Sequence, residues 1–214
     1  MSELHRIKCG NGNCYIISSL SDSNAVLVDT HQEKYRKKIL AACKKYNIRL
    51  IILTHGHLDH AQNAAWLSKQ LNVPVAMHRN DVSLISDNMT QPMEAHTFLG
   101  KIVLSVSQKK LNSNNIPAFI PEVFLKEGDT LNDYGIDGQI ISLPGHTDGS
   151  IGIDIDRKHL IVGDALMNMF YPTVSMLYHN KIDMLESARK ISSIGDRIIY
   201  FGHGKPVANR IWTK

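Results

Sequence analysis

The sequence predicts a mixed α+β domain in which helices cover β-sheets. Short runs rich in β-branched residues recur between turn residues, and they fall into two groups that each close with a helical pattern. The chain has 214 residues, which is long enough to bury a sizeable core. No internal repeat, low-complexity tract or linker-like change of composition interrupts it. We therefore expect a single domain spanning residues 1–214.

The first group of strands alternates with helices. The expected elements are strands at residues 13–18 and 25–30, a helix ending near residue 46, a strand at 49–54, a helix at about 59–71 and a strand at 73–78. The segment SLSDSN between the first two strands has the composition of a hairpin turn. Alternation of strands and helices indicates a sheet covered by helices.

The second group follows a segment that is harder to interpret, residues 80–122. Within it, two stretches have helical composition and the remainder resembles a loop; the helical stretches are residues 81–88 and 98–111, and the loop is 112–122. Short strands are then expected at residues 122–131, 139–144, 150–156, 159–166 and 197–204. Before the last strand, Asp183 and Glu186 form a capping-box pattern that predicts a helix start, and Gly195 predicts its end.

Composition and charge exclude several classes of protein. The net charge is +4, and the basic run EKYRKK at residues 33–38 opens a helical pattern, so it indicates a solvated helix face rather than a nucleic-acid patch. No apolar stretch approaches the roughly 20 residues that span a bilayer, and the N-terminus lacks the apolar core of a signal peptide. We expect a soluble cytoplasmic protein with no membrane and no large nucleic acid as partner. Its three cysteines form no paired framework, which favours free thiols.

The segment THGHLDH concentrates metal-capable side chains directly after an apolar run. It places three histidines and an aspartate within six positions, at His55, His57, Asp59 and His60. In extended chain, residues two apart point to the same side, so His55 and His57 can converge on one point. Imidazole and carboxylate groups are the ligands of zinc and similar divalent ions. A metal site is therefore a better explanation than a set of surface histidines.

Three later positions repeat this arrangement. Each is a metal-capable residue beside glycine at the end of an apolar run: His146 in LPGHTDG, Asp164 in LIVGDAL and His203 in YFGHGKP. Glycine lets the backbone turn sharply and approach a ligand closely. Any one of His146, Asp164 and His203 alone would be more typical of a turn residue. Together they predict that the strand ends on one rim of a sheet sandwich gather all seven side chains.

These motifs resemble those of the metallo-β-lactamase-fold superfamily. The segments NCYII and AVLVDT are similar to its opening hairpin, THGHLDH to its H-x-H-x-D-H signature, and GHT, GD and GHG to its later ligand motifs. The resemblance covers almost the whole chain. It implies an αββα sandwich, with two mixed β-sheets packed face to face, helices on the outer faces and a metal site on one edge.

The resemblance also implies which residues hold the metal ions. Seven positions match the family's ligands; they are His55, His57 and His146 for one ion, Asp59, His60 and His203 for the second, and Asp164 bridging both. The expected cofactors are two divalent ions, with zinc as the first choice and iron or manganese as alternatives. Asp29 is expected to orient a ligand histidine, with a turn-capping role as the alternative.

The implied activity is hydrolysis of a small ester, lactone or thioester by a hydroxide shared between two metal ions, with Asp59 as the catalytic proton acceptor. The zinc lactamases proper carry a cysteine where this chain has Asp164, and none of its three cysteines falls at a ligand position. The resemblance therefore favours the branch of the family that contains glyoxalase II and the lactonases. The chain ends about eleven residues past His203 and so lacks the helical domain that binds glutathione in typical glyoxalase II. Tyr171 and Tyr178 are weak candidates for contacting substrate, because neither is in register with the lactonase tyrosine.

Two other activities are alternatives for the same set of ligands. Persulfide dioxygenases of the same family use one iron ion held by two histidines and an aspartate, and these ligands overlap with the set above. Small phosphodiesters are a further substrate class, because paired metal ions also suit phosphate oxygens. A non-enzymatic metal-binding protein is disfavoured, since all seven ligand positions are filled.

Residues 80–122 are expected to form a lid or insertion over the metal edge. Seven flexible or aromatic side chains are candidates for an apolar pocket there: Met89, Met93, Phe98, Met167, Met169, Phe170 and Met176. For any one of them, an ordinary place in the core or in a homodimer contact is the alternative. Three histidines are excluded as ligands; they are His78, His96 and His179.

Overall fold

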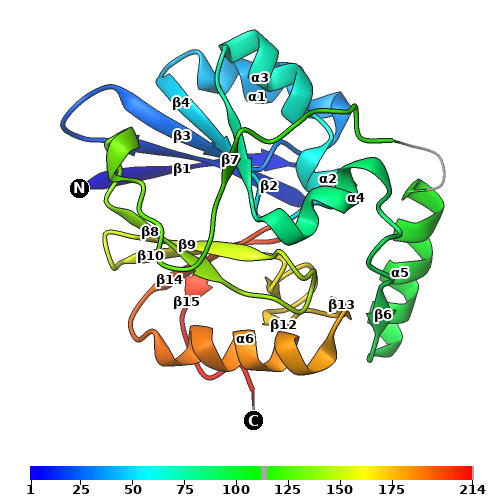
Figure 1. Cartoon of the computed structure of the whole chain (residues 1–214). Helices are drawn as coiled ribbons and strands as arrows, with labels where there is room; N and C mark the ends of the chain where they lie inside the picture. The colour runs from blue at the N-terminus through cyan, green and yellow to red at the C-terminus, as the bar shows by residue number, and fades with distance from the viewer. Residues whose placement is uncertain (112–114, 214) are drawn as a thin grey trace.

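Two mixed β-sheets pack face to face and carry helices on their outer faces, as the computed structural model of the chain shows (Figure 1). The structure describes residues 1–111 and 115–213. The predicted αββα sandwich is therefore confirmed. The N-terminus lies at the edge of the first sheet, and the C-terminus emerges near the outer helix of the second (Figure 1).

The first sheet has six strands in the order β1-β2-β3-β4-β5-β7. Their bounds are β1 Ser2–Cys9, β2 Gly12–Ser19, β3 Asn24–Val28, β4 Asn47–Ile52, β5 Val75–Met77 and β7 Val123–Phe124. The pairs β1–β2 and β2–β3 are antiparallel, and the remaining pairs are parallel. The parallel strands β3 and β4 therefore end at the same edge of the sheet.

The second sheet has five strands in the order β15-β14-β10-β9-β8. Their bounds are β8 Gly138–Ser142, β9 Ile151–Ile155, β10 His159–Gly163, β14 Ile198–Phe201 and β15 Val207–Ala208. Strands β10 and β14 are parallel, whereas the other pairs are antiparallel. Two short two-stranded sheets, β11 Leu166–Met167 with β12 Thr173–Val174 and β13 Leu177–Tyr178 with β6 Glu94–Ala95, lie outside the main layers.

The helices lie on both outer faces. The α-helices are α1 Arg36–Cys43, α2 Leu58–Ala61, α3 Ala64–Leu71, α4 Val82–Ser86, α5 Phe98–Leu111 and α6 Lys181–Ser193; the 3₁₀ turns are η1 Glu33–Tyr35, η2 Arg79–Asp81 and η3 Asn132–Tyr134. In Figure 1, α1 and α3 cover the first sheet, α6 covers the second, and α5 stands to one side beyond α2 and α4.

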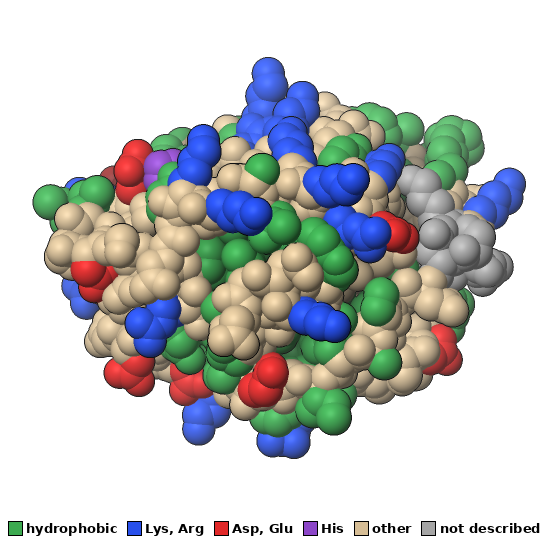
Figure 2. Space-filling view, turned by 90° about the horizontal axis from the view of Figure 1, so that it is seen from above, with side chains coloured by type: hydrophobic (Ala, Val, Ile, Leu, Met, Phe, Trp, Pro, Cys, Tyr) green, Lys and Arg blue, Asp and Glu red, His purple; other side chains and the backbone are tan. Residues whose placement is uncertain are grey.

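Lys and Arg side chains are distributed over the face seen from above (Figure 2), and on α1 Lys37 and Lys38 are exposed while Ile39 is buried. The predicted solvated helix face is confirmed.

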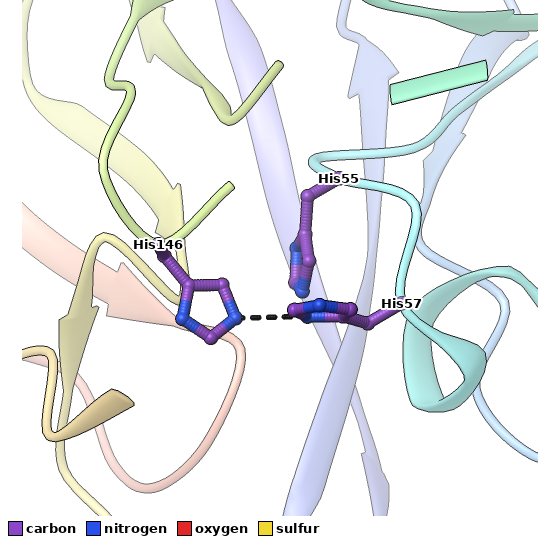
Figure 3. Close-up of side chains that lie close together, drawn as sticks. All are labelled: His55, His57 and His146. Atoms are coloured by element: carbon purple, nitrogen blue, oxygen red, sulfur yellow. Dashed lines mark hydrogen bonds between the residues drawn. The ribbon is translucent and has the colours of Figure 1, made fainter. Parts of the chain in front are cut away.

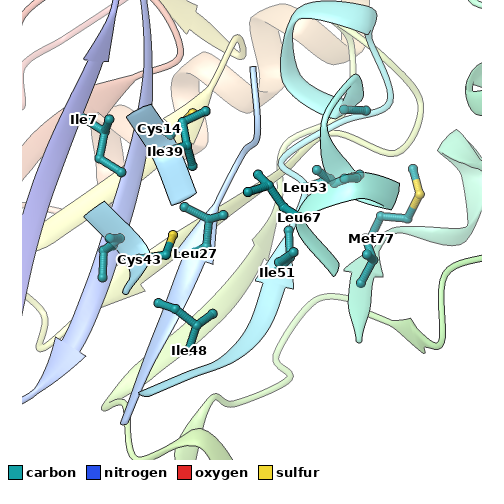
Figure 4. Packing of buried hydrophobic residues seen from close by; sticks show 14 of the residues in the cluster. Ile7, Cys14, Leu27, Ile39, Cys43, Ile48, Ile51, Leu53, Leu67 and Met77 are labelled. Atoms are coloured by element: carbon teal, nitrogen blue, oxygen red, sulfur yellow. The ribbon is translucent and has the colours of Figure 1, made fainter. Parts of the chain in front are cut away.

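Three apolar layers hold the sandwich together, because successive side chains of a strand point to opposite faces. On β3, Val26 faces the layer between the two sheets, whereas Leu27 faces α1 and α3. The layer under α1 and α3 also contains Ile39 and Leu67 (Figure 4). A third layer lies between the second sheet and α6. The continuous apolar strands of the sequence follow from this burial on both faces.

The structure corrects three local expectations. Strand β1 was not predicted, because its polar alternation is that of an edge strand, which only pairing with β2 defines. The helix expected at 59–71 is two helices, α2 and α3. Helix α6 begins at Lys181, because the Asn180 side chain accepts hydrogen bonds from the Ile182 and Asp183 amides. The cap is thus Asn180 and not Asp183, whereas Gly195 ends the helix at φ +89° as predicted.

The strand expected at residues 122–131 is only β7, which pairs with β5 in the first sheet and does not join the second group. The expectations for the cysteines and for the helical stretches of residues 80–122 are met. The three cysteines are free and buried, as expected for thiols. Helices α4 and α5 occupy the two stretches of residues 80–122 with helical composition, and residues 112–114 of the expected loop lie outside the described part. Within residues 1–111 and 115–213, no helix is long and apolar enough to cross a membrane.

Candidate metal centre

The seven predicted ligand residues lie at the ends of strands from both sheets. His55 follows β4, and His57, Asp59 and His60 belong to the turn and first residues of α2. From the second sheet, three single residues follow three strands: His146 comes after β8, Asp164 after β10 and His203 after β14. The structure brings all seven together in three overlapping groups, in which the ligand atoms lie within 4.8 Å of one another.

The first group consists of His55, His57 and His146. Their rings point toward one another from two different halves of the molecule (Figure 3). The His57 Nδ1 and His146 Nε2 atoms are 3.0 Å apart. All three side chains are buried. Three convergent nitrogens in a buried pocket form the donor set that a zinc-like cation prefers.

The second group consists of Asp59, His60 and His203, and Asp164 lies between the two groups. The His203 Nε2 atom is 3.3 Å from Asp59 Oδ2 and 3.4 Å from Asp164 Oδ2. Asp164 also lies 3.6 Å from His60 Nε2 and 3.8 Å from His146 Nε2. Its carboxylate thus faces histidines of both groups, which is the geometry that a bridging ligand requires.

Hydrogen bonds behind the cluster fix which nitrogen of each ring faces inward. Asp29 accepts a hydrogen bond from His60 Nδ1 over 2.8 Å, so the Nε2 atom of that ring is free to point at Asp164. Thr54 Oγ1 donates to the same carboxylate over 2.9 Å, and its lone pair faces His55 Nδ1 at 3.1 Å. Asp29 therefore makes the contact that the predicted orienting role requires, directly for His60 and through Thr54 for His55.

The opposite side of the cluster is oriented in the same way. His146 Nδ1 donates to the Leu177 carbonyl oxygen over 2.9 Å, which directs Nε2 into the cluster. Three buried ligand atoms of the cluster have no hydrogen-bond partner; they are His55 Nε2, His60 Nε2 and Asp164 Oδ1. Buried polar atoms are normally satisfied. The atoms that face into the cluster are nitrogens and carboxylate oxygens, so the residues present fit a pair of divalent cations.

The two groups differ in their electrostatics. Burial lowers the pKa of His57 to about 3 and lowers the pKa of His55 and His146 as well. These rings are therefore neutral at pH 7, which is the form that binds a metal ion.

Carboxylates reverse this shift in the second group. Burial acts to lower the pKa of His60, but Asp29 and Asp164 outweigh it and raise the pKa well above its usual value. Burial likewise opposes the rise at His203, whose pKa is raised by Asp164 and Asp59. Without a metal ion, His60 and His203 therefore carry protons that a bound cation would displace.

A cavity of about 100 Å³ opens onto the cluster. Its apolar wall includes four of the predicted methionines, Met89, Met93, Met167 and Met169, and it is completed by residues of α5 such as Val103 and Leu104. Residues of segment 80–122 thus line the cavity beside the cluster, as expected for a segment over the metal edge. The remaining candidates lie outside this cavity: Phe98 is 79% exposed, Met176 is buried, and Phe170, 58% exposed, lines a second cleft beside Asp59 and His203.

The predicted tyrosine contacts with substrate have no support in this cavity. Among the described residues that line it, neither Tyr171 nor Tyr178 is found. Tyr171 is half exposed, and the Tyr178 ring packs against His96 with ring centres 5.6 Å apart. Tyr171 lies between β11 and β12 and Tyr178 lies in β13, and no sequence pattern specified the path of these short strands.

Two residues near the cluster were missed by the sequence analysis. Asp81 is fully buried and binds the loops that carry the ligands. His31 is buried with φ +53° and lines a second cleft of about 490 Å³ that also reaches Asp59 and His203. A single aspartate after a strand and a single histidine after VDT give no pattern, and only their burial in the fold distinguishes them.

Comparison with known proteins agrees with this geometry. The sequence profile of the Metallo-beta-lactamase superfamily matches residues 7–203. Hydroxyacylglutathione hydrolase GloC of Haemophilus influenzae is 29% identical over 196 residues, covering 90% of this chain and 85% of that protein. The crystal structure of BLEG-1, a B3 metallo-beta-lactamase, superposes with a TM-score of 0.74 at 20% identity over 97% of this chain and 94% of that one. TTHA1623 in a di-iron-bound form gives a TM-score of 0.68 at 20% identity, over 96% and 94%.

Proposed function

The chain belongs to the metallo-β-lactamase superfamily, and on that premise we propose that it is a metal-dependent hydrolase of a small ester, lactone or thioester. The observation that carries this proposal is the convergence of seven nitrogen and carboxylate donors on one rim of the sandwich. The cavity above them supports a small substrate, because about 100 Å³ of space leads directly to the donors. Its methionine-rich wall suits an apolar acyl group, since methionine adapts to varied shapes.

The donors divide between two cations. His55, His57 and His146 would hold one, and Asp59, His60 and His203 the other, with Asp164 shared. When bound, such a pair lowers the pKa of water and polarises a carbonyl group, which is the chemistry that acyl hydrolysis needs. Zinc is the proposed metal, because three imidazoles form its usual ligand set. Iron is the alternative to test, since TTHA1623 has been crystallised in a di-iron-bound form.

Asp59 is the residue proposed to assist the nucleophile. Its side chain is 37% exposed and lines the cavity, whereas the other six donors are buried. Burial acts to raise the pKa of Asp59, but the hydrogen bond from His203 and the charges of His60, His203 and His57 together outweigh it and hold the pKa well below its usual value. Asp59 is therefore ionised at neutral pH. One carboxylate oxygen can accept the proton of an attacking water while the group stays oriented by His203.

Thioesters are the first substrate class to examine. The similarity to a hydroxyacylglutathione hydrolase supports this choice, because an acylglutathione is a thioester. Lactones and simple esters follow, since all three present the same carbonyl carbon to the nucleophile. The second cleft, which is also lined by Asp59 and His203, offers about 490 Å³ for the leaving group.

The experiment compares wild type with His57→Asn and with His159→Asn. His57 belongs to the cluster, whereas His159 lies at the start of β10, at the opposite end of that strand from Asp164, and serves as the matched control. Each protein is stripped of metal, reloaded with zinc, iron or manganese and assayed on thioesters, lactones, esters and phosphodiesters. We expect acyl hydrolysis to fall by more than about 100-fold in His57→Asn, since even residues that only support a ligand cost 10- to 100-fold.

Three results would contradict the proposal. Equal rates in wild type and His57→Asn would remove the cluster from the chemistry. A single iron per chain with oxygen uptake on a persulfide, and no acyl hydrolysis, would identify a dioxygenase instead. Turnover confined to phosphodiesters would assign the same donors to phosphate chemistry.

A further inference from the structure

A buried carboxylate lies behind the first ligand group. Asp81, in the turn η2 after β5, is completely inaccessible to solvent and accepts four hydrogen bonds. The Gly56 amide and the Thr147 hydroxyl donate to Oδ2 over 2.9 and 2.7 Å. The Gly149 amide and the Gln91 side-chain nitrogen donate to Oδ1 over 2.7 and 3.1 Å. Both oxygens are thus fully used by neutral donors.

Three of these donors, from Gly56, Thr147 and Gly149, belong to the two loops that supply the first ligand group. Gly56 separates His55 from His57 in the loop after β4, and Thr147 directly follows His146 in the loop after β8. One loop leaves the first sheet and the other leaves the second. Asp81 therefore joins the two halves of the sandwich. It does so close to the point where the histidines of the two loops meet, which Figure 3 shows.

Two glycines allow this close approach. A Cβ atom on Gly149 would lie 2.6 Å from Asp81 Oδ1, and a Cβ atom on Gly56 would lie 2.8 Å from the Asp81 carbonyl oxygen. Neither position can carry a side chain without moving Asp81 or its loop. The glycines of THGHLDH and GHTDGS are therefore matched to Asp81 and not only to the metal ligands.

A hydroxyl relay extends the same junction. Thr147 Oγ1 must donate its proton to Asp81, because a carboxylate only accepts. The Ser150 hydroxyl, 2.7 Å from Thr147 Oγ1, is then the donor to it, and Ser150 Oγ accepts from the Thr147 amide over 3.1 Å. Hydrogen bonds to both its backbone and its side chain therefore fix the orientation of Thr147, the residue after His146.

We propose that Asp81 is a positioning residue that holds His57 and His146 together and thereby sets the metal affinity of the three-histidine group. This inference rests on the proposed metal-dependent function and adds a residue to it. An asparagine of the same shape would offer one accepting oxygen and would turn its NH₂ group toward an amide or hydroxyl donor. The loops would separate, and the ligand nitrogens would lose their alignment.

The test is competition between a chelator and the metal-stripped protein for zinc. We expect Asp81→Asn to lower the affinity of one of the two binding steps by about 10- to 100-fold, the range for residues that orient ligands, and to leave the other step unchanged. A comparison variant is Asp29→Asn: Asp29 contacts His60 of the second group directly and His55 of the first group through Thr54, so this variant should weaken both steps. The matched control is Asp87→Asn, an exposed carboxylate of the same segment that accepts from the Met89 amide. It should change neither step.

A milder pair of variants covers the case in which Asp81→Asn does not fold. Thr147→Val removes one of the four hydrogen bonds, and Thr147→Ser retains the hydroxyl. We expect a partial loss of the same affinity in the first and its recovery in the second.

The possible outcomes separate the two proposals. In one outcome, the Asp81 and Thr147 variants bind two ions as tightly as wild type does and differ only in a lower urea midpoint. Asp81 would then have a structural role alone, so the inference would be wrong while the proposed function would stand. Equal weakening of both steps would also overturn the inference. Wild type that binds no divalent ion would overturn the proposed function itself, and the inference with it.

Discussion

His31 should make the metal-free protein lose stability as the pH falls below 6.5. Burial lowers the pKa of His31 from its ordinary value of 6.5 to about 4. Its Nδ1 atom accepts the Gln32 amide over 2.7 Å, so a proton there would break this bond, and Nε2 is buried without a partner. The unfolded chain therefore binds a proton near pH 6.5, whereas the folded chain resists it until about pH 4. Stability is highest above pH 6.5 and declines between these values.

The magnitude follows from the displaced pKa. Each unit is worth 1.36 kcal/mol, so at pH 5, about 1.5 units below the unfolded value, His31 should cost about 2 kcal/mol. The variant His31→Asn removes the titrating group, and asparagine tolerates the φ of +53° at this position. The matched control is His5→Asn, which removes a partly exposed histidine of β1.

The assay is urea unfolding of the three metal-stripped proteins at pH 7.5 and pH 5. Wild type and the His5→Asn control should lose about 2 kcal/mol more than His31→Asn between these two values. Other buried histidines contribute equally to all three proteins and cancel in the difference. The same pH dependence in wild type and His31→Asn would refute the reasoning, because it would mean that His31 is protonated as readily in the folded state as in the unfolded one.

Three further predictions concern the metal centre and the sandwich. Asp29→Asn should lower zinc affinity about 10- to 100-fold, because His60 loses the carboxylate that orients it. Competition with a chelator measures the zinc affinity, and an unchanged affinity would contradict the prediction. Since the pKa values of His60 and His203 are raised, binding of a metal ion to the second group should release protons, and the metal affinity of this group should fall as the pH is lowered. Calorimetry in buffers of different ionisation enthalpy would detect the released protons. No release would be seen if these two rings were already neutral. Tyr15→Phe should cost about 1–2 kcal/mol in urea unfolding, because the Phe201 carbonyl loses a buried 2.6 Å hydrogen bond between the two sheets; a change below about 0.5 kcal/mol would contradict this.

Much of the fold could be predicted from local patterns. Strands such as β3 and β4 are continuous apolar runs bounded by polar turns, so their positions follow from hydrophobicity alone. The start of α6 could not be predicted correctly, because Asn180 and Asp183 are both good capping residues and the contacts of the folded chain decide between them. Strand β1 escaped for a related reason, since a half-exposed edge strand is defined by its partner.

The candidate ligands could be predicted because metal binding needs few and distinctive residue types. Histidines at alternate positions, as at His55 and His57, seldom occur without a ligand to share, and the later histidines and aspartate repeat the same context beside glycine. The substrate contacts could not be predicted in this way. The prediction for Tyr171 and Tyr178 rests on their distance along the chain from Asp164, which does not determine where a side chain points.

The amino-acid order by itself therefore determined the layers of the sandwich and the donors available to a metal ion, because burial and ligation each depend on the chemistry of single side chains. Only the tertiary structure decided which groups hold those donors in place. Asp81 meets Gly149, 68 positions away, and the Nε2 atom of His31 is buried without a partner where Gly12, at the start of β2, packs against it. Such roles arise from contacts between distant segments, and no local pattern of residues encodes them.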